Sequence, residues 1–150
     1  MAVTEEQLAQ DLTAAMKARD AQRVAVLRSV VAAAKLIKVE RRAPSLDEAD
    51  LVQVLRKEVR KREEAEEFAV KAGREDLISQ NRAERAILDE YVPPPLGADE
   101  LERAIRDVLA GGVPRQMGAV MAALRERFPG RLDGKVASEL ARKVLAEAAG

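Results

Sequence analysis

The stretch VPPPL, residues 92–96, divides this sequence into two parts. Each proline lacks an amide proton and biases the residue before it toward extended geometry, so a helix cannot continue through the three prolines. A run of this kind forms a semi-rigid spacer. We therefore predict an N-terminal helical domain at residues 1–92, a proline-rich linker at 93–97 and a C-terminal domain at 98–150.

The sequence on both sides of this linker has the composition of a helical protein. Aromatic residues make up 2 % of the 150 residues, whereas Ala, Leu, Glu, Lys and Arg are abundant. The abundant residues are good helix formers, and the aromatic residues that sheets favour are scarce. We predict an all-α fold, in which a four-helix bundle-like domain with one long helix is joined by the linker to a small three-helix tail domain.

Four helices are predicted before the linker. Thr4-Glu-Glu-Gln7 and Ser45-Leu-Asp-Glu48 match the capping box, in which a Ser or Thr hydroxyl caps the helix while the Glu or Gln reaches back to the cap amide. Apolar residues at helical spacing, with Pro and Gly between the runs, give the bounds of the four helices. The first spans residues 5–18, and the second runs from a cap at Asp20 to a stop at Pro44. The third runs from the Ser45 cap to Ala72, before Gly73, and the fourth spans residues 75–91.

The long third helix contains the charged run RKREEAEE, residues 60–67. Oppositely charged residues four apart, each pair contributing about 0.2–0.5 kcal/mol, explain the run without a ligand. We interpret this half of the helix as a solvated face that projects into solvent, and a binding patch is the alternative. The pairs are Glu58 with Arg62, Arg60 with Glu64, Arg62 with Glu66, and Glu67 with Lys71.

Three shorter helices are predicted after the linker, at residues 99–110, 115–128 and 134–148, with Gly and Pro between them. In the second of these, we interpret Met117-Gly-Ala-Val-Met121 as core packing, with Gly118 allowing another backbone to approach closely.

Cations concentrate in this C-terminal part. The whole chain has 26 Lys and Arg against 26 Asp and Glu, but residues 115–143 contain seven cations against three acids. In the last helix, Lys135, Glu139, Arg142 and Lys143 fall within about 100° of arc. We expect free amides at this helix start to bind phosphate together with the cations. The predicted phosphate-binding residues are Lys135, Arg131, Arg127, Arg142, Lys143 and Gly134. The alternative is that Asp133 caps the helix, Gly134 eases the turn and the cations only solubilise the domain, and both interpretations can hold together.

The sequence offers little chemistry for catalysis. It has no His and no Cys, no nucleophile elbow and no nucleotide-binding glycine motif, so we predict no catalytic residue, metal site or cofactor. No uncharged apolar run of membrane-spanning length is present, and acids occupy the N-terminal segment where a secretory signal carries cations. We therefore expect a cytoplasmic protein without membrane contact.

Several motifs in order along the chain resemble the GatB/YqeY family. This family includes YqeY-like proteins and the C-terminal helical and tail domains of the GatB component of the tRNA-dependent Asp/Glu amidotransferase. The motifs are Ala15-Met-Lys-Ala-Arg-Asp20, Val26-Leu-Arg28, the charged helix from Lys57 to Glu67, Ala72-Gly-Arg-Glu-Asp-Leu77, Ile87-Leu-x-x-Tyr-Val-Pro93, Met117-Gly-Ala-Val-Met121 and Asp133-Gly-Lys135.

The resemblance implies a tail domain that faces RNA, with tRNA or another structured RNA as partner and an amidotransferase or tRNA-synthesis protein as a further partner. It also implies an alternative, participation in glutamine-dependent amide transfer as a carbon–nitrogen ligase, although the catalytic domain of the amidotransferase is absent from this sequence. Two other readings remain open: a protein–protein adaptor that uses residues 60–68, and a helix-turn-helix DNA reader, for which the turn at 128–135 is long and glycine-rich.

Overall fold

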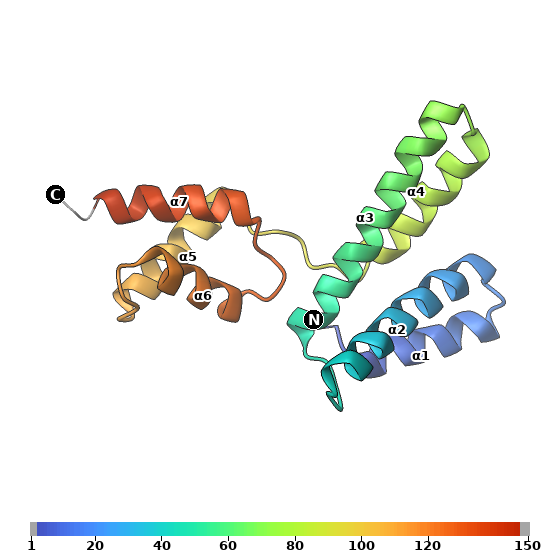
Figure 1. The fold of residues 1–150 in the computed structure, drawn as a ribbon, viewed down its shortest axis with the longest axis horizontal. Helices are drawn as coiled ribbons and strands as arrows, with labels where there is room; N and C mark the ends of the chain where they lie inside the picture. Colours follow the sequence, from blue (N-terminus) through green and yellow to red (C-terminus); the bar gives the residue numbers. More distant parts are fainter. Residues whose placement is uncertain (1–2, 148–150) are drawn as a thin grey trace. The chain divides into compact units, whose positions relative to one another are not determined.

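The structure is a computed structural model that describes residues 3–147. Over this range it contains seven helices and no strand, so the predicted all-α fold class is confirmed (Figure 1). The predicted end of the last helix at Ala148 lies outside the described residues. The helices are α1 (Glu5–Lys17), α2 (Ala21–Arg41), α3 (Glu48–Ala72), α4 (Glu75–Asp89), α5 (Ala98–Ala110), α6 (Met117–Arg127) and α7 (Gly134–Glu147).

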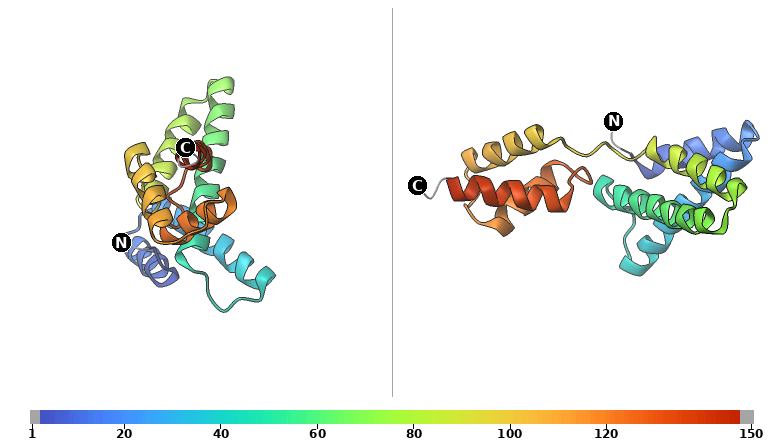
Figure 2. Two further views of the ribbon diagram at one scale, coloured as in Figure 1. Left: turned by 90° about the vertical axis from the view of Figure 1, so that its left-hand side faces the viewer. Right: turned by 90° about the horizontal axis from the view of Figure 1, so that it is seen from above.

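The chain divides into two compact units between Pro93 and Pro94. In the N-terminal unit α1 packs on α2, α3 packs on α4, and α2 contacts both members of the second pair. Figure 2 shows α3 and α4 lying side by side along their length. The apolar faces of these helices form one core, which includes Leu8, Leu27, Leu51, Leu55 and Leu88. Full burial of each such side chain stabilises the fold by about 1.5–3 kcal/mol.

The helix starts of this unit match the predicted caps only in part. The Thr4 hydroxyl accepts the Gln7 amide at 3.1 Å as predicted, but the Gln7 side chain donates to Asp11 and does not reach back. The Ser45 cap is wrong: Asp47 caps α3 by accepting the Asp50 amide at 2.9 Å.

The later start of α3 has a physical reason in the loop before it. Leu46 is buried, and its amide donates to Glu5 Oε2 at 2.9 Å, so the residue after Ser45 is held outside the helix. Asp47 is then the first side chain placed to cap. At the other end, Gly73 closes α3 with φ 67°, the left-handed conformation expected of a glycine at a helix C-terminus.

The prediction that the charged half of α3 projects into solvent is wrong for its inner face, because α4 packs along it. Glu66 accepts a hydrogen bond from Arg82 of α4 and lies 3.7 Å from Arg85. Glu63 and Glu64 remain exposed, as a solvated face requires. The sequence run thus combines one solvent face with one face that is paired to α4.

The C-terminal unit consists of α5, α6 and α7, which pack pairwise around a second core. Val120, Met121 and Leu124 contribute to it from α6, and Ala137, Ala141 and Val144 from α7. The interpretation of the Met117–Met121 motif as packing is therefore confirmed, with the correction that no atom lies within 4 Å of a Cβ built at Gly118. No backbone approaches this glycine closely.

Candidate functional site

The predicted phosphate-binding residues on α7 share its outward face. Lys135, Arg142 and Lys143 are exposed, whereas Ala137, Ala141 and Val144 on the other side are buried in the core of the C-terminal unit. The burial pattern therefore fixes which way α7 faces, and it turns the three cations to solvent. Glu139 lies on the same exposed face and reduces its net charge.

These cations differ in how far their charge is already neutralised. Lys143 Nζ lies 3.8 Å from a Glu102 carboxylate oxygen, and Arg127 Nη2 lies 3.9 Å from Asp107. Within residues 3–147, no ion pair involves the side chains of Lys135 or Arg142. These two cations thus have the least competition for an incoming anion.

Arg131 has a structural contact that the sequence did not indicate. Its Nε donates to the Pro94 carbonyl at 2.9 Å, and its own carbonyl accepts the Leu96 amide at the same distance. The two bonds hold the proline segment against the loop that precedes α7. Arg131 is half-buried, in contrast to the exposed cations of α7.

The prediction of free amides at the start of α7 is wrong for Lys135 and Val136. Asp133 Oδ1 accepts the Lys135 amide at 3.0 Å and the Val136 amide at 3.3 Å. This carboxylate occupies two of the amides that a bound phosphate would use, and it adds a negative charge at the same place. An anion here would therefore depend mainly on side chains. At Gly134 an added Cβ would meet nothing within 4 Å, so the fold itself does not require glycine there.

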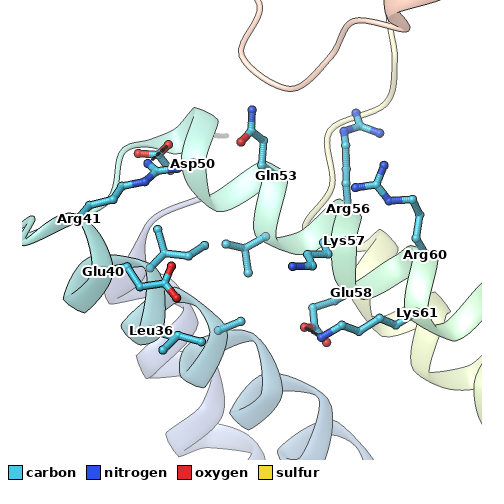
Figure 3. Close-up of a pocket in the computed structure, with 13 residues that line it drawn as sticks. Leu36, Glu40, Arg41, Asp50, Gln53, Arg56, Lys57, Glu58, Arg60 and Lys61 are labelled. Carbon is cyan, nitrogen blue, oxygen red and sulfur yellow. Dashed lines mark hydrogen bonds and ion pairs between the residues drawn. The ribbon is translucent and has the colours of Figure 1, made fainter.

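A second candidate site, which the sequence-based prediction missed, lies between α2 and α3 of the N-terminal unit. It is a groove of about 570 Å³ (Figure 3). The helix α2 contributes Ala33, Leu36, Ile37, Glu40 and Arg41, and α3 contributes Asp50, Gln53, Val54, Arg56, Lys57, Glu58, Arg60 and Lys61. Because its apolar residues come mainly from one helix and its cations mainly from the next, no short sequence motif indicates it.

The groove has an apolar floor and a cationic wall. Leu36 on the floor is 59 % exposed, which is unusual for a large apolar side chain. On the wall, Lys57 points into the groove and Lys61 points toward Glu58, while Arg56 and Arg60 point to the outer rim (Figure 3). Arg41 and Asp50 close one end with an ion pair of 2.8 Å, and the Arg41 guanidinium lowers the pKa of Asp50.

Glu58, at the other end of the groove, is 2 % exposed and belongs to a chain of polar contacts that connects three helices. It accepts from Ser29 Oγ of α2 at 2.9 Å, from Lys61 Nζ at 3.2 Å and from Arg62, which in turn lies 3.5 Å from Glu84 of α4. Burial alone would raise the pKa of Glu58, but these hydrogen bonds outweigh it and the pKa lies below its usual value. The carboxylate therefore stays ionised at the groove's edge.

Neither a metal site nor a membrane-spanning helix is found in the described part of the chain. There, no cluster of three or more Asp, Glu, His or Cys side chains could hold a metal ion. None of the helices in that part has both the length and the apolar character that crossing a bilayer requires.

Comparison with known proteins identifies a family and a relative. The family model described as Yqey-like protein matches residues 5–145. The relative is "Altered inheritance of mitochondria protein 41, mitochondrial" of Eremothecium gossypii, which is 32 % identical over 96 residues, covering 63 % of this chain and 52 % of that protein. The chain thus spans about half the length of the curated relative that it matches. Because the family match covers nearly the whole sequence and both helical units, the chain belongs to the YqeY-like protein family.

Proposed function

We propose that the C-terminal unit binds the phosphate backbone of structured RNA, with tRNA as the class that the resemblance to the amidotransferase tail suggests. The observation that carries the proposal is the exposed cationic face of α7, on which Lys135 and Arg142 have no ion pair within the described residues. Lys143 and Arg127 add positive charge, although each already lies within 4 Å of a carboxylate, of Glu102 and of Asp107 respectively. In this proposal Arg131 holds the loop before α7 in position, and the main phosphate contacts come from the α7 cations.

Contact with phosphates fits this unit better than contact with bases. Phe128 is its single aromatic residue, it is half-buried, and the Arg127 guanidinium lies 5.4 Å from its ring centroid. Proteins that read single strands stack bases on exposed aromatic rings. Cations on a helix face instead neutralise phosphates and release counterions, which makes binding depend on salt more than on sequence. A structured RNA presents such a backbone in a fixed geometry.

The test is a binding titration of the full chain against unfractionated tRNA at two salt concentrations, with a DNA duplex of matched length as competitor. The variant carries Lys135→Glu and Arg142→Glu, which are seven positions apart on one helix face. We expect weaker binding and a salt slope reduced by about two, because each lost phosphate contact reduces that slope by about one.

The chain offers a matched control in Arg28→Glu with Lys35→Glu. These two cations are also seven positions apart and exposed, but they lie on α2. The control changes the net charge equally and is expected to retain most of the affinity. Equal losses in both double variants, with helix content unchanged by circular dichroism, would show that binding follows net charge only and would refute the α7 face as the site.

A further inference from the structure

The groove between α2 and α3 has a chemistry that the proposed RNA function does not use. We propose that this groove binds an acidic amphipathic helix of a partner protein. All of its lining residues lie in the N-terminal unit, whereas the proposed RNA contacts lie in the C-terminal unit.

The first argument is the apolar floor. Ala33, Leu36 and Ile37 line the groove from α2, and Val54 lines it from α3. Leu36 is 59 % exposed, and Val39 less than one turn further along α2 is 68 % exposed. Val26, Leu27 and Val30 of the same helix are, by contrast, fully buried. Leu36 lines the groove and Val39 does not, so the two form an exposed apolar pair at its edge, and neighbouring exposed apolar side chains at a groove are typical of an interaction surface.

The second argument is the charge that borders this floor. Lys57, Arg60 and Lys61 are exposed along one wall, Lys57 lying three and four positions before the other two on α3. Within residues 3–147 no ion pair involves Lys57 or Arg60, and the Lys61 side chain stays 57 % exposed despite its contact with Glu58. Charges that border an apolar groove select a partner of opposite sign and guide its approach.

The acids of the groove do not cancel this wall. Asp50 is paired with Arg41 at 2.8 Å, and Glu58 is buried under Arg62, Lys61 and Ser29. Glu40 remains, on α2 at the Arg41 end and away from Lys57 and Lys61 (Figure 3). We therefore expect the bound helix to place its carboxylates at the Lys57–Lys61 end and neutral or basic residues at the Glu40 end.

A protein helix suits this surface better than RNA does. Phosphates would gain from the cations but nothing from Leu36, Ile37 or Val54, and no aromatic residue lines the groove for base stacking. An amphipathic helix uses both parts, since its apolar residues at i, i+3, i+4 and i+7 fill the floor while its acidic flank meets the wall.

The test is selection from a displayed library of helical peptides on the immobilised full chain. The peptides have about 16 residues, or roughly 24 Å of helix. Leucines are fixed at i, i+3, i+4 and i+7, and the remaining positions vary among Glu, Lys, Gln and Ala, so that the selection itself reports the preferred charge. We expect enriched peptides to be rich in Glu on one flank of the leucines.

Titration of an enriched peptide against variants then locates its site. Lys57→Glu with Arg60→Glu is expected to raise the dissociation constant at least about tenfold, and Leu36→Ser to raise it by several-fold. All three side chains are exposed, so both variants are expected to fold, and circular dichroism checks this. Lys135→Glu with Arg142→Glu is the control, with a change within about twofold expected.

Three outcomes would overturn the proposal. The first is enrichment of neutral or basic peptides, or of none. The second is unchanged affinity in both groove variants. The third concerns the Lys57→Glu with Arg60→Glu variant. If it still binds the peptide but loses tRNA binding, the groove is an RNA site; if it loses self-association instead, the groove binds a second copy of the chain. Failure of the RNA proposal itself would appear in the Lys135→Glu with Arg142→Glu variant and leaves these results unaffected.

Discussion

Glu58 is the charged side chain most deeply buried in the described part of the chain, and its surroundings explain why it is tolerated there. A buried carboxylate is strongly unfavourable unless hydrogen bonds compensate its lost hydration. Ser29, Lys61 and Arg62 supply those bonds from α2 and α3. The same carboxylate therefore fixes α3 against α2 at the end of the groove.

We predict that Glu58→Gln lowers the free energy of unfolding by about 2–4 kcal/mol, less than a fully broken buried pair costs, because Arg62 loses the Glu58 carboxylate but keeps Glu84 at 3.5 Å. The pKa of Glu58 is lowered in the fold, so its contribution is present above the pKa of an unfolded Glu and is lost as pH falls through the folded value. Urea unfolding of both proteins at neutral and acidic pH measures this. Their difference should shrink in acid, while the exposed control Glu64→Gln changes stability by less than about 0.5 kcal/mol.

Gly134 gives a second prediction, because the fold leaves room for a methyl group there and its φ is not left-handed. Gly134→Ala should stabilise the C-terminal unit by about 0.4–1 kcal/mol by restricting the unfolded chain. If a phosphate backbone packs against the start of α7, the added methyl group should also weaken tRNA binding. A variant that is more stable and binds tRNA equally well would remove Gly134 from the proposed site.

At the level of elements, one hydrogen bond joins the first helix of the N-terminal unit to the residues after its last helix. Tyr91 follows α4, and its hydroxyl donates to Asp11 Oδ2 of α1 at 2.5 Å. Arg23 of α2 pairs with the neighbouring Glu90 at 2.9 Å. Together these contacts fix the end of α4 next to α1 and α2.

Burial and the Asp11 carboxylate raise the pKa of Tyr91 far above that of a free tyrosine. An unfolded Tyr ionises near pH 10, so the unfolding free energy should fall as pH rises above about 10. Tyr91→Phe should remove this alkaline fall and cost about 1.5–3 kcal/mol at neutral pH, since the lost bond is to a charged group. The chain has one Tyr and no Trp, so ultraviolet absorption of the phenolate follows this group alone. Ionisation near pH 10 in the folded chain would contradict the predicted environment.

Helix positions were largely predictable from the sequence because each depends on neighbouring residues. Asp20 caps the start of α2 and Gly73 ends α3, as the local sequence predicts. The Met117–Met121 motif packs in the core, as its spacing indicates. The errors arise where distant residues decide. Ser45 loses the cap because Glu5 holds the Leu46 amide, and the charged run of α3 is half covered because α4 supplies Arg82 and Arg85.

The candidate sites show the same limit. The outward face of α7 follows from helical periodicity within one element, so the sequence located it. An Asp one residue before the helix permits a cap at Asp133, but only the folded loop shows that its carboxylate takes the Lys135 and Val136 amides. The groove was missed because it exists only where α2 and α3 come together, and the charged run of α3 contains only Arg60 and Lys61 of its lining.

At the level of the whole molecule, two hydrophobic cores stabilise the chain, and they share no residue. Domains of the size of the C-terminal unit are only marginally stable. We therefore predict that the two units unfold in separate transitions. Leu88→Ala should lower the stability of the N-terminal transition by about 2–5 kcal/mol, and Ile105→Ala should do the same only for the C-terminal one. Calorimetry of the full chain distinguishes this from one cooperative transition that moves with both substitutions.

The two hydrogen bonds of Arg131 have a mechanical consequence. The Pro94 carbonyl and the Leu96 amide both precede α5, and both are bonded to Arg131 in the loop before α7. A pulling force applied to the prolines from the N-terminal side would therefore act on this loop before it acted on α5. Under such a force the C-terminal unit is held by the loop that precedes α7. The Arg131 hydrogen bonds would break first, while the hydrophobic core of the C-terminal unit was still intact.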